Sequence, residues 1–208
     1  YFSSCMLKSP INLSVCSSNG NGIEVFDLSL AEDDLLNLLL ESPNSESIKT
    51  IAEQLEIDHN FSFSKDRNDL QGVWELRWSS SNSPFLKYSP FIDNLQILDP
   101  LNLNGLNLLK PRGIKSIIGT GILIRLNYIN EKKIGVKFTH AGVIGPKFGR
   151  KNIKAMKEIN NEQLGWLEIT YLSNKLRICR GDKGTLFVLR KINSPTLFKN
   201  FKEFIKIY

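Results

Sequence analysis

The spacing of apolar residues along the chain changes near position 70. Before that point, apolar side chains recur every three or four residues, as on one face of a helix. After it, apolar and polar residues alternate, as in strands that bury one face. The sequence therefore predicts helices followed by a sheet, an α+β fold that is mainly β.

Two helices are expected within residues 28–60. The first, over 30–41, follows a capping box made by Ser29 and Glu32 and stops before a proline. The second, over 47–57, carries an apolar stripe at helical spacing, formed by Ile48, Ile51, Ala52 and Leu55. The short link between them predicts a helical hairpin.

The first strand is expected from Leu70 onward. Alternation puts Trp74 and Trp78 on one face, and Glu75 and Arg77 on a face that we expect to meet solvent. Turn residues separate further expected strands, which are 91–98, 117–129, 133–140, 151–159, 164–172, 176–180 and 185–191. The remaining stretch, over 99–110, alternates leucine and asparagine and fits either a strand or a long loop.

Seven or more antiparallel strands with short links predict a barrel or a sandwich over residues 68–192. For the last hairpin we expect a tight turn at residues 181–184, which pairs Arg180 with Thr185 and Ile178 with Phe187. Arg177 and Cys179 then lie on the opposite face.

Residues 193–208 predict a C-terminal amphipathic helix, with Pro195 in its first turn. Its apolar face includes Phe201, and the flanking lysines are Lys199, Lys202 and Lys206. Such a helix suits two positions: peripheral contact with an anionic membrane through Phe201 and the lysines, or packing on the barrel. The sequence leaves both open.

Composition narrows the classes of protein. Hydrophobic residues make up 41% and charged residues 23%, an ordinary globular balance. No apolar run approaches the ~18 to 20 residues of a membrane-spanning helix. Lysine and arginine exceed aspartate and glutamate by six, so the positive net charge favours binding to anionic surfaces. We expect residues 1–27, rich in serine, to form a flexible leader, with a remnant of a targeting peptide as the alternative.

Residues for catalysis or metal binding are sparse. The three cysteines, Cys5, Cys16 and Cys179, match no zinc spacing. Neither His59 nor His140 has an aspartate or glutamate at metal spacing. We therefore expect neither an enzyme nor a cofactor.

Two motifs carry a family resemblance. Gly72-Val73-Trp74 opens the first long strand, as in lipocalin-type barrels, where the tryptophan closes the barrel floor. The strings WLEITYL at 166–172 and LRICRGDKGTLFVL at 176–189 resemble the C-terminal signature of the plastid lipid-associated protein (fibrillin) family. One departure is Ser173, which stands where that family commonly has an aspartate.

The resemblance covers roughly residues 30–191 and implies a lipocalin-like β-barrel that binds or carries lipids at thylakoids or lipid globules of plastids and cyanobacteria. The leading hypothesis is non-catalytic binding of a hydrophobic small molecule: a fatty acid, quinone, carotenoid or other isoprenoid. An arginine inside such a barrel is costly unless it meets a carboxylate, so Arg177 and Arg180 are candidates for holding a polar head group, with structural bonds as the alternative. The residues expected at the ligand are Trp74, Trp78, Phe91, Phe138, Trp166, Tyr171, Arg177, Arg180 and Phe187.

Two other functions are weaker. A lipid-modifying barrel enzyme, similar to an isomerase or cyclase, lacks a visible pair of acid and base groups. A basic nucleic-acid-binding domain is disfavoured because basic residues alternate with acidic ones and no aromatic and basic surface motif occurs. We expect no nucleic-acid partner.

Overall fold

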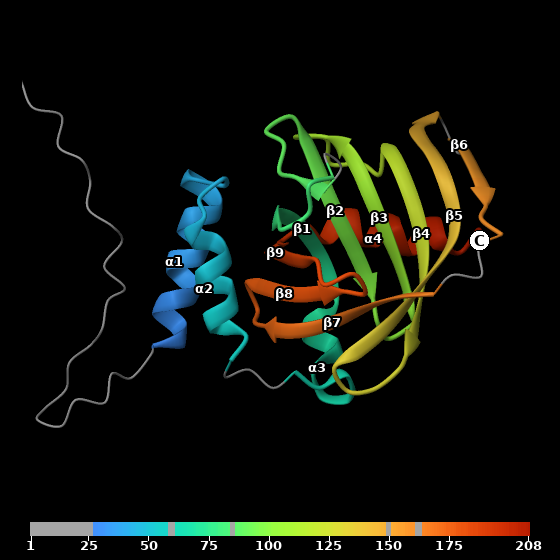
Figure 1. Ribbon diagram of the computed structural model, residues 1–208. Helices are drawn as coiled ribbons and strands as arrows, with labels where there is room; N and C mark the ends of the chain where they lie inside the picture. The colour runs from blue at the N-terminus through green and yellow to red at the C-terminus, as the bar shows by residue number, and fades with distance from the viewer. Residues whose placement is uncertain (1–26, 58–60, 84–85, 149–150, 161–163) are drawn as a thin grey trace, which may run out of the picture.

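The computed structural model describes residues 27–57, 61–83, 86–148, 151–160 and 164–208 (Figure 1). Four helices and nine strands occupy these residues. The expected leader, residues 1–27, lies outside them apart from Asp27. None of the helices in these ranges has the length and apolar character needed to cross a membrane.

Nine strands form one antiparallel sheet in the order β4-β3-β2-β1-β9-β8-β7-β5-β6. Because β4 also pairs with β5, every strand except β6 belongs to a closed ring, and β6 extends β5 outside it. The prediction of a mainly antiparallel β fold is confirmed. The strands are β1 (Gly72–Ser79), β2 (Ile92–Asp99), β3 (Asn104–Pro111), β4 (Gly119–Tyr128), β5 (Lys133–Phe148), β6 (Lys151–Glu158), β7 (Gly165–Leu172), β8 (Leu176–Gly181) and β9 (Leu186–Ile192).

Two helices precede the sheet and pack beside β8 and β9, namely α1 (Leu28–Glu41) and α2 (Ser47–Leu55) (Figure 1). The expected capping box is wrong. Asp27 caps α1, because its carboxylate accepts hydrogen bonds from the backbone N–H groups of Ser29 at 3.0 Å and Leu30 at 3.3 Å. Glu32 is instead buried at the sheet, where it accepts a 2.6 Å hydrogen bond from the Tyr171 hydroxyl.

A third helix, α3 (Phe63–Leu70), precedes β1 and overlaps the predicted strand only at Leu70. Leu70 therefore ends a helix, and β1 begins two residues later, at Gly72. Only Phe63 and Leu70 of this helix are buried. The helix therefore lacks the periodic apolar stripe on which a prediction from sequence depends. These two side chains and Phe61 pack into one end of the ring.

Most of the leucine and asparagine segment forms β3, a strand covered on both faces, and residues 100–103 form the turn that precedes it. Leu106 and Leu108 point outward and pack under the last helix, whereas Asn107 points into the ring. The alternation thus separates the outer layer from the ring interior, and neither side of the strand faces open solvent.

The faces of β1 differ from the prediction at two points. Trp74 and Leu76 point into the ring, but a bulge after Leu76 turns Trp78 outward against α1 and α2. Glu75 and Arg77 do lie on the outer face, yet they are only 1% and 3% exposed. The prediction of a solvent-facing side was wrong because helices and loops cover the outside of the ring there.

The β8–β9 hairpin is shifted by one residue from the expected register. Arg180 pairs with Leu186 and Cys179 with Phe187, because the turn holds one residue more than expected. Within it, the Gly181 and Gly184 amides donate to Thr185 and Gly181 carbonyls, at 2.9 Å each. A one-residue shift exchanges the two faces of the returning strand. Phe187 therefore faces the interior beside Cys179.

The last helix, α4 (Pro195–Ile205), packs on the outside of the sheet behind β2, β3 and β4 (Figure 1). Its buried residues are Leu197, Phe201 and Phe204. Of the two positions expected for this helix, the structure therefore shows packing. Phe201 has no exposed surface, so it is unavailable for the membrane contact expected of it.

Candidate ligand-binding cavity

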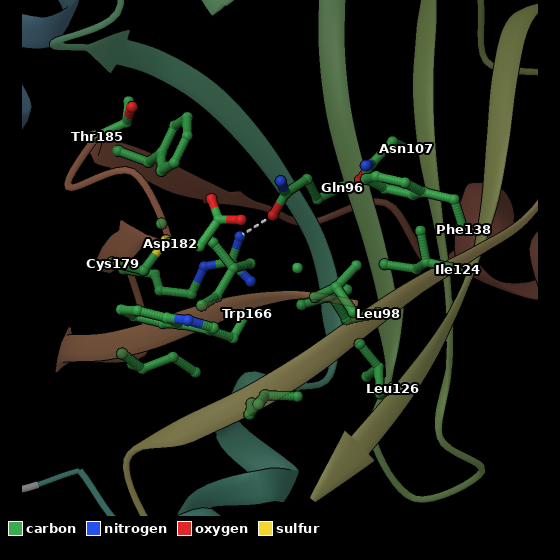
Figure 2. Close-up of a pocket in the computed structure, with 18 of the residues that line it drawn as sticks. Gln96, Leu98, Asn107, Ile124, Leu126, Phe138, Trp166, Cys179, Asp182 and Thr185 are labelled. Carbon is green, nitrogen blue, oxygen red and sulfur yellow. Dashed lines mark hydrogen bonds between the residues drawn. The ribbon is translucent and has the colours of Figure 1, made fainter. Parts of the chain in front are cut away.

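A cavity of about 730 Å³ lies inside the ring (Figure 2). Small-molecule sites typically occupy ~300 to 1,000 Å³, so its volume suits one ligand. Most of its wall is apolar and comes from β2, β4, β5, β7 and β9. These residues include Leu98, Ile124, Leu126, Ile134, Val136, Phe138, Trp166, Leu167, Ile169 and Phe187.

The two ends of the cavity differ. Leu70 of α3 lines one end, where α3 closes the ring. At the other end the wall includes exposed side chains, among them Leu164, which is 61% exposed. We call this end the mouth, defined by Leu86, Leu164, Asp182, Lys183 and Thr185. The cavity therefore opens beside the β8–β9 turn and the start of β7.

Arg177 is the charged group of the inner wall. Its side chain is only 1% exposed, and its guanidinium carbon lies 5.1 Å from the centroid of the Trp74 ring. The guanidinium donates a hydrogen bond to Oε1 of Gln96, drawn as a dashed line in Figure 2. Burial lowers the pKa of Arg177. Within the described residues, no carboxylate pairs with this side chain, and its Nε has no hydrogen-bond partner.

Two other polar groups complete the inner wall. Asn107 lies opposite Gln96 on the neighbouring strand, and its Oδ1 is buried without a hydrogen-bond partner among the described residues. The Cys179 thiol is buried, and burial raises its pKa. A thiol of this kind is protonated and unreactive at neutral pH.

Four of the nine residues predicted at the ligand line the cavity: Phe138, Trp166, Arg177 and Phe187. Trp74 also points into the ring but lies beneath Arg177, fully buried, and its indole N–H donates a 2.8 Å hydrogen bond to the Leu70 carbonyl. It closes the floor, as the sequence predicted for the Gly-x-Trp motif.

The other four lie away from the cavity, which corrects the expected positions. Trp78 and Tyr171 face the N-terminal helices, the first because of the bulge in β1. Tyr171 donates to Glu32, and burial together with that carboxylate raises its pKa. Arg180 points outward, where its Nε lies 2.9 Å from Oε1 of Glu56, so the structural alternative holds for it. Phe91 is 79% exposed before β2.

The sequence reasoning missed Gln96 and Asn107. Both are polar residues in strands, and a polar residue in an alternating strand is normally assigned to the solvent face. The available signal was the alternation of Asn107 with Leu106 and Leu108, two leucines that an outer helix covers here.

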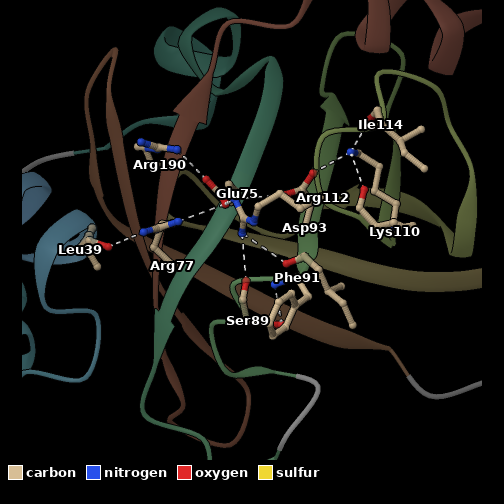
Figure 3. A network of polar contacts seen from close by, with 12 residues as sticks. Leu39, Glu75, Arg77, Ser89, Phe91, Asp93, Lys110, Arg112, Ile114 and Arg190 are labelled. Atoms are coloured by element: carbon tan, nitrogen blue, oxygen red, sulfur yellow. Dashed lines mark hydrogen bonds and ion pairs between the residues drawn. The ribbon is translucent and has the colours of Figure 1, made fainter.

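A second polar cluster lies on the outside of the ring (Figure 3). Glu75 accepts from Arg112 at 3.0 Å and from Arg190 at 2.8 Å, and lies 3.3 Å from Arg77. Burial by itself raises the pKa of Glu75, but the three arginines outweigh it and hold the pKa of that carboxyl below its usual value. Arg77 also donates to the Leu39 carbonyl of α1 at 2.5 Å. The cluster joins β1, β9 and the loop after β3 to α1, and it is a structural feature.

No group of three or more histidine, cysteine, aspartate or glutamate side chains suited to a metal ion occurs within the described ranges. The His140 ring lies 4.9 Å from the Tyr208 ring, centroid to centroid, which is a packing contact. His59 lies outside the described residues.

Comparison with known proteins shows to which family this chain belongs. The PAP_fibrillin family model matches residues 32–190, more than half of the chain. The chain belongs to the PAP/fibrillin family. Over 38 residues it is 55% identical to the light-induced protein, chloroplastic, of Solanum tuberosum, and equally to that of Solanum demissum. Each match covers 18% of this chain and 12% of the relative. No solved structure was found to match.

Ser173, the departure from the fibrillin pattern, shapes the β7–β8 turn. Its hydroxyl oxygen accepts hydrogen bonds from the backbone N–H groups of Lys175 at 3.0 Å and Leu176 at 2.9 Å. An aspartate side chain forms the same kind of turn. The serine therefore holds this turn with an uncharged side chain.

Proposed function

We propose that this PAP/fibrillin protein forms a lipocalin-like barrel that binds or carries one hydrophobic small molecule and catalyses no reaction. The observation that carries the proposal is the cavity of about 730 Å³ inside a closed ring of strands, with a mainly apolar wall and an exposed mouth. Burial of apolar surface, at ~25 cal/mol per Å², is sufficient to drive such binding.

The classes of ligand that we propose are a fatty acid, a quinone, a carotenoid or another isoprenoid lipid. The proposed location is the plastid, at photosynthetic membranes or lipid globules. Two findings support it: the family model and the chloroplastic relatives. The excess of basic residues favours peripheral contact with an anionic membrane. The side chains proposed for this contact are Lys199 and Lys202 of α4 and Lys206, the residue that follows it.

We assign no catalytic residue. Apart from Asp182 and Lys183 at the mouth, the titratable side chains that line the cavity are Arg177 and Cys179, and burial favours the neutral form of the cysteine. General acid-base chemistry needs a group that exchanges its proton near the operating pH. Neither side chain meets that requirement.

The test is native mass spectrometry of the full chain purified from its own host, followed by extraction and analysis of what copurifies. We expect one bound apolar molecule per chain. A matched pair of variants locates it. Val136→Phe places a larger side chain in the cavity and should reduce copurification, whereas Val143→Phe adds the same ring at an exposed position of the same strand and should not.

If the parent protein carries no apolar molecule and takes up none from a panel of lipids, the proposed function is wrong. Full retention of the molecule by both variants would show that it binds elsewhere.

A further inference from the structure

We propose that the cavity takes its ligand head-first, with an anionic carboxylate on Arg177, Gln96 and Asn107 and an apolar tail directed toward the mouth. This inference rests on the proposed function and narrows it, because it selects a carboxylate lipid over a neutral isoprenoid.

The first step is the unusual position of Arg177 among the buried cations. Three lysine or arginine side chains are buried in the part of the chain that the structure describes. Arg77 lies 3.3 Å from Glu75, and Lys110 lies 2.6 Å from Asp93. Arg177 has only the neutral amide of Gln96 and the face of Trp74. A buried charge without a counter-charge is costly, so the inner wall is electrostatically incomplete.

The second step is that both unpaired atoms belong to residues that line the same cavity. Nε of Arg177 is a buried donor without a partner, and Gln96 and Asn107 face each other in the β2–β3 register. Oδ1 of Asn107 is also buried without a partner among the described residues. Turning that amide by half a rotation puts its NH₂ group at the same position. The wall then offers a guanidinium and an amide N–H as donors, which suit the acceptor-only oxygens of a carboxylate.

The third step is the direction of the chain. From Arg177 to the mouth the wall is mostly apolar, with Ile124, Phe138, Trp166 and Phe187 along it, and the polar residues Asp182, Lys183 and Thr185 stand at the mouth itself. An acyl or isoprenoid tail buries its surface there, and its free end reaches Leu164 and Leu86 at the mouth. The single charge of Arg177 matches the single charge of a carboxylate.

The experiment compares hexadecanoic acid with hexadecanol, which share the tail and differ in the head group. Binding to the delipidated full chain is followed at neutral pH by titration calorimetry and by tryptophan fluorescence, to which Trp166 of the wall contributes together with Trp74 and Trp78. We expect the acid to bind at least about ten-fold more tightly than the alcohol, because a hydrogen bond to a charged group is worth that ratio.

Variants assign the preference to Arg177. Arg177→Met should remove the advantage of the acid and change the affinity for the alcohol less than about three-fold. Arg180→Met is the matched control, because Arg180 stands on the same strand but points out of the ring toward Glu56. It should keep the preference. If Arg177→Met does not fold, Asn107→Leu and Gln96→Leu should each reduce the preference.

Equal affinities for acid and alcohol in the parent protein would overturn this inference and leave the proposed function standing. An acid preference that survives Arg177→Met, or that survives both amide variants, would also overturn it. Failure of both probes to bind would contradict the proposed function itself.

Discussion

Two arginines three positions apart, on one strand, have opposite roles. Arg177 points into the ring, is almost fully buried and meets only neutral groups. Arg180 points outward and forms ion pairs with Glu53 of α2 and with Glu56, the residue that follows α2. Residues an odd number of positions apart on a strand face opposite sides, so the alternation of a strand separates them. The chemistry of a side chain is thus decided by the side of the ring on which it lies.

At the residue scale, Trp74 is the clearest prediction for stability. Trp74→Ala should lower the free energy of unfolding by ~3 to 5 kcal/mol, because it removes a fully buried ring and the hydrogen bond to the Leu70 carbonyl. Urea unfolding followed by circular dichroism measures the change.

Trp166→Ala is the control for that prediction, since Trp166 borders the open cavity and is only half-buried. This substitution should lower the free energy of unfolding by clearly less than Trp74→Ala does. Unchanged stability of Trp74→Ala would show that this ring does not close the floor.

At the element scale, each helix is positioned by polar contacts to the sheet as well as by apolar packing. The contact of α3 is a carboxylate from the β4–β5 turn. Glu131 accepts from the Ser62 and Ser64 hydroxyls, both at 2.7 Å, and from the Ser64 backbone N–H at 3.0 Å. The hydrogen bonds from Ser62 and Ser64 lower the pKa of Glu131 to about 2. A negative charge at the start of a helix also suits the helix dipole.

This contact predicts a pH dependence with a definite sign. A carboxyl group whose pKa is lower in the folded chain stabilises it above its ordinary pKa of about 4.5, and this contribution is lost as pH falls toward about 2. Glu131→Gln should therefore unfold more easily than the parent at neutral pH, and the difference should vanish near pH 2. Urea unfolding at a series of pH values measures it.

Glu41→Gln serves as the control, since Glu41 is an exposed carboxylate at the end of α1. The free energy of unfolding of Glu41→Gln should differ little from that of the parent at every pH. A difference for Glu131→Gln that stayed constant from neutral to acid pH would show that the charge of Glu131 is not what holds α3.

At the scale of the whole molecule, closure of the ring by the pairing of β4 with β5 separates an inside from an outside. On the outside, the apolar strand residues are covered by α1 and α2 at β8 and β9, and by α4 at β2 to β4. On the inside, α3 fills one end and the cavity occupies the rest. The ring is therefore solid at its floor and open toward its mouth.

A bound ligand should stabilise the whole fold. At a free concentration of about 100 times its Kd, a ligand that binds only the folded chain raises the free energy of unfolding by about 2.7 kcal/mol. Thermal unfolding of the delipidated protein with and without hexadecanoic acid measures this as a rise in Tm. Val136→Phe should show a smaller rise and Val143→Phe a rise like that of the parent. An equal rise in all three proteins would contradict binding in the cavity.

The sequence by itself determined the class of fold and most of the elements. Alternation marked strands near β2, β4, β7, β8 and β9, and helical spacing marked α1, α2 and α4, because these segments bury one regular face each. It also determined the role of Trp74 and the family, through short strings of residues. The element without a periodic stripe, α3, was not predicted, since it buries only its two end residues.

Only the tertiary structure decided which side of each strand lines the cavity. A bulge in β1 reversed Trp78, and one additional turn residue shifted the β8–β9 register, so that Phe187 lies inside with Cys179. Helices cover much of the outer face, so leucines lie outside and Gln96 and Asn107 inside, opposite to the usual assignment of polar residues. Periodicity shows that a strand has two different faces, but what covers each face depends on segments distant in the sequence.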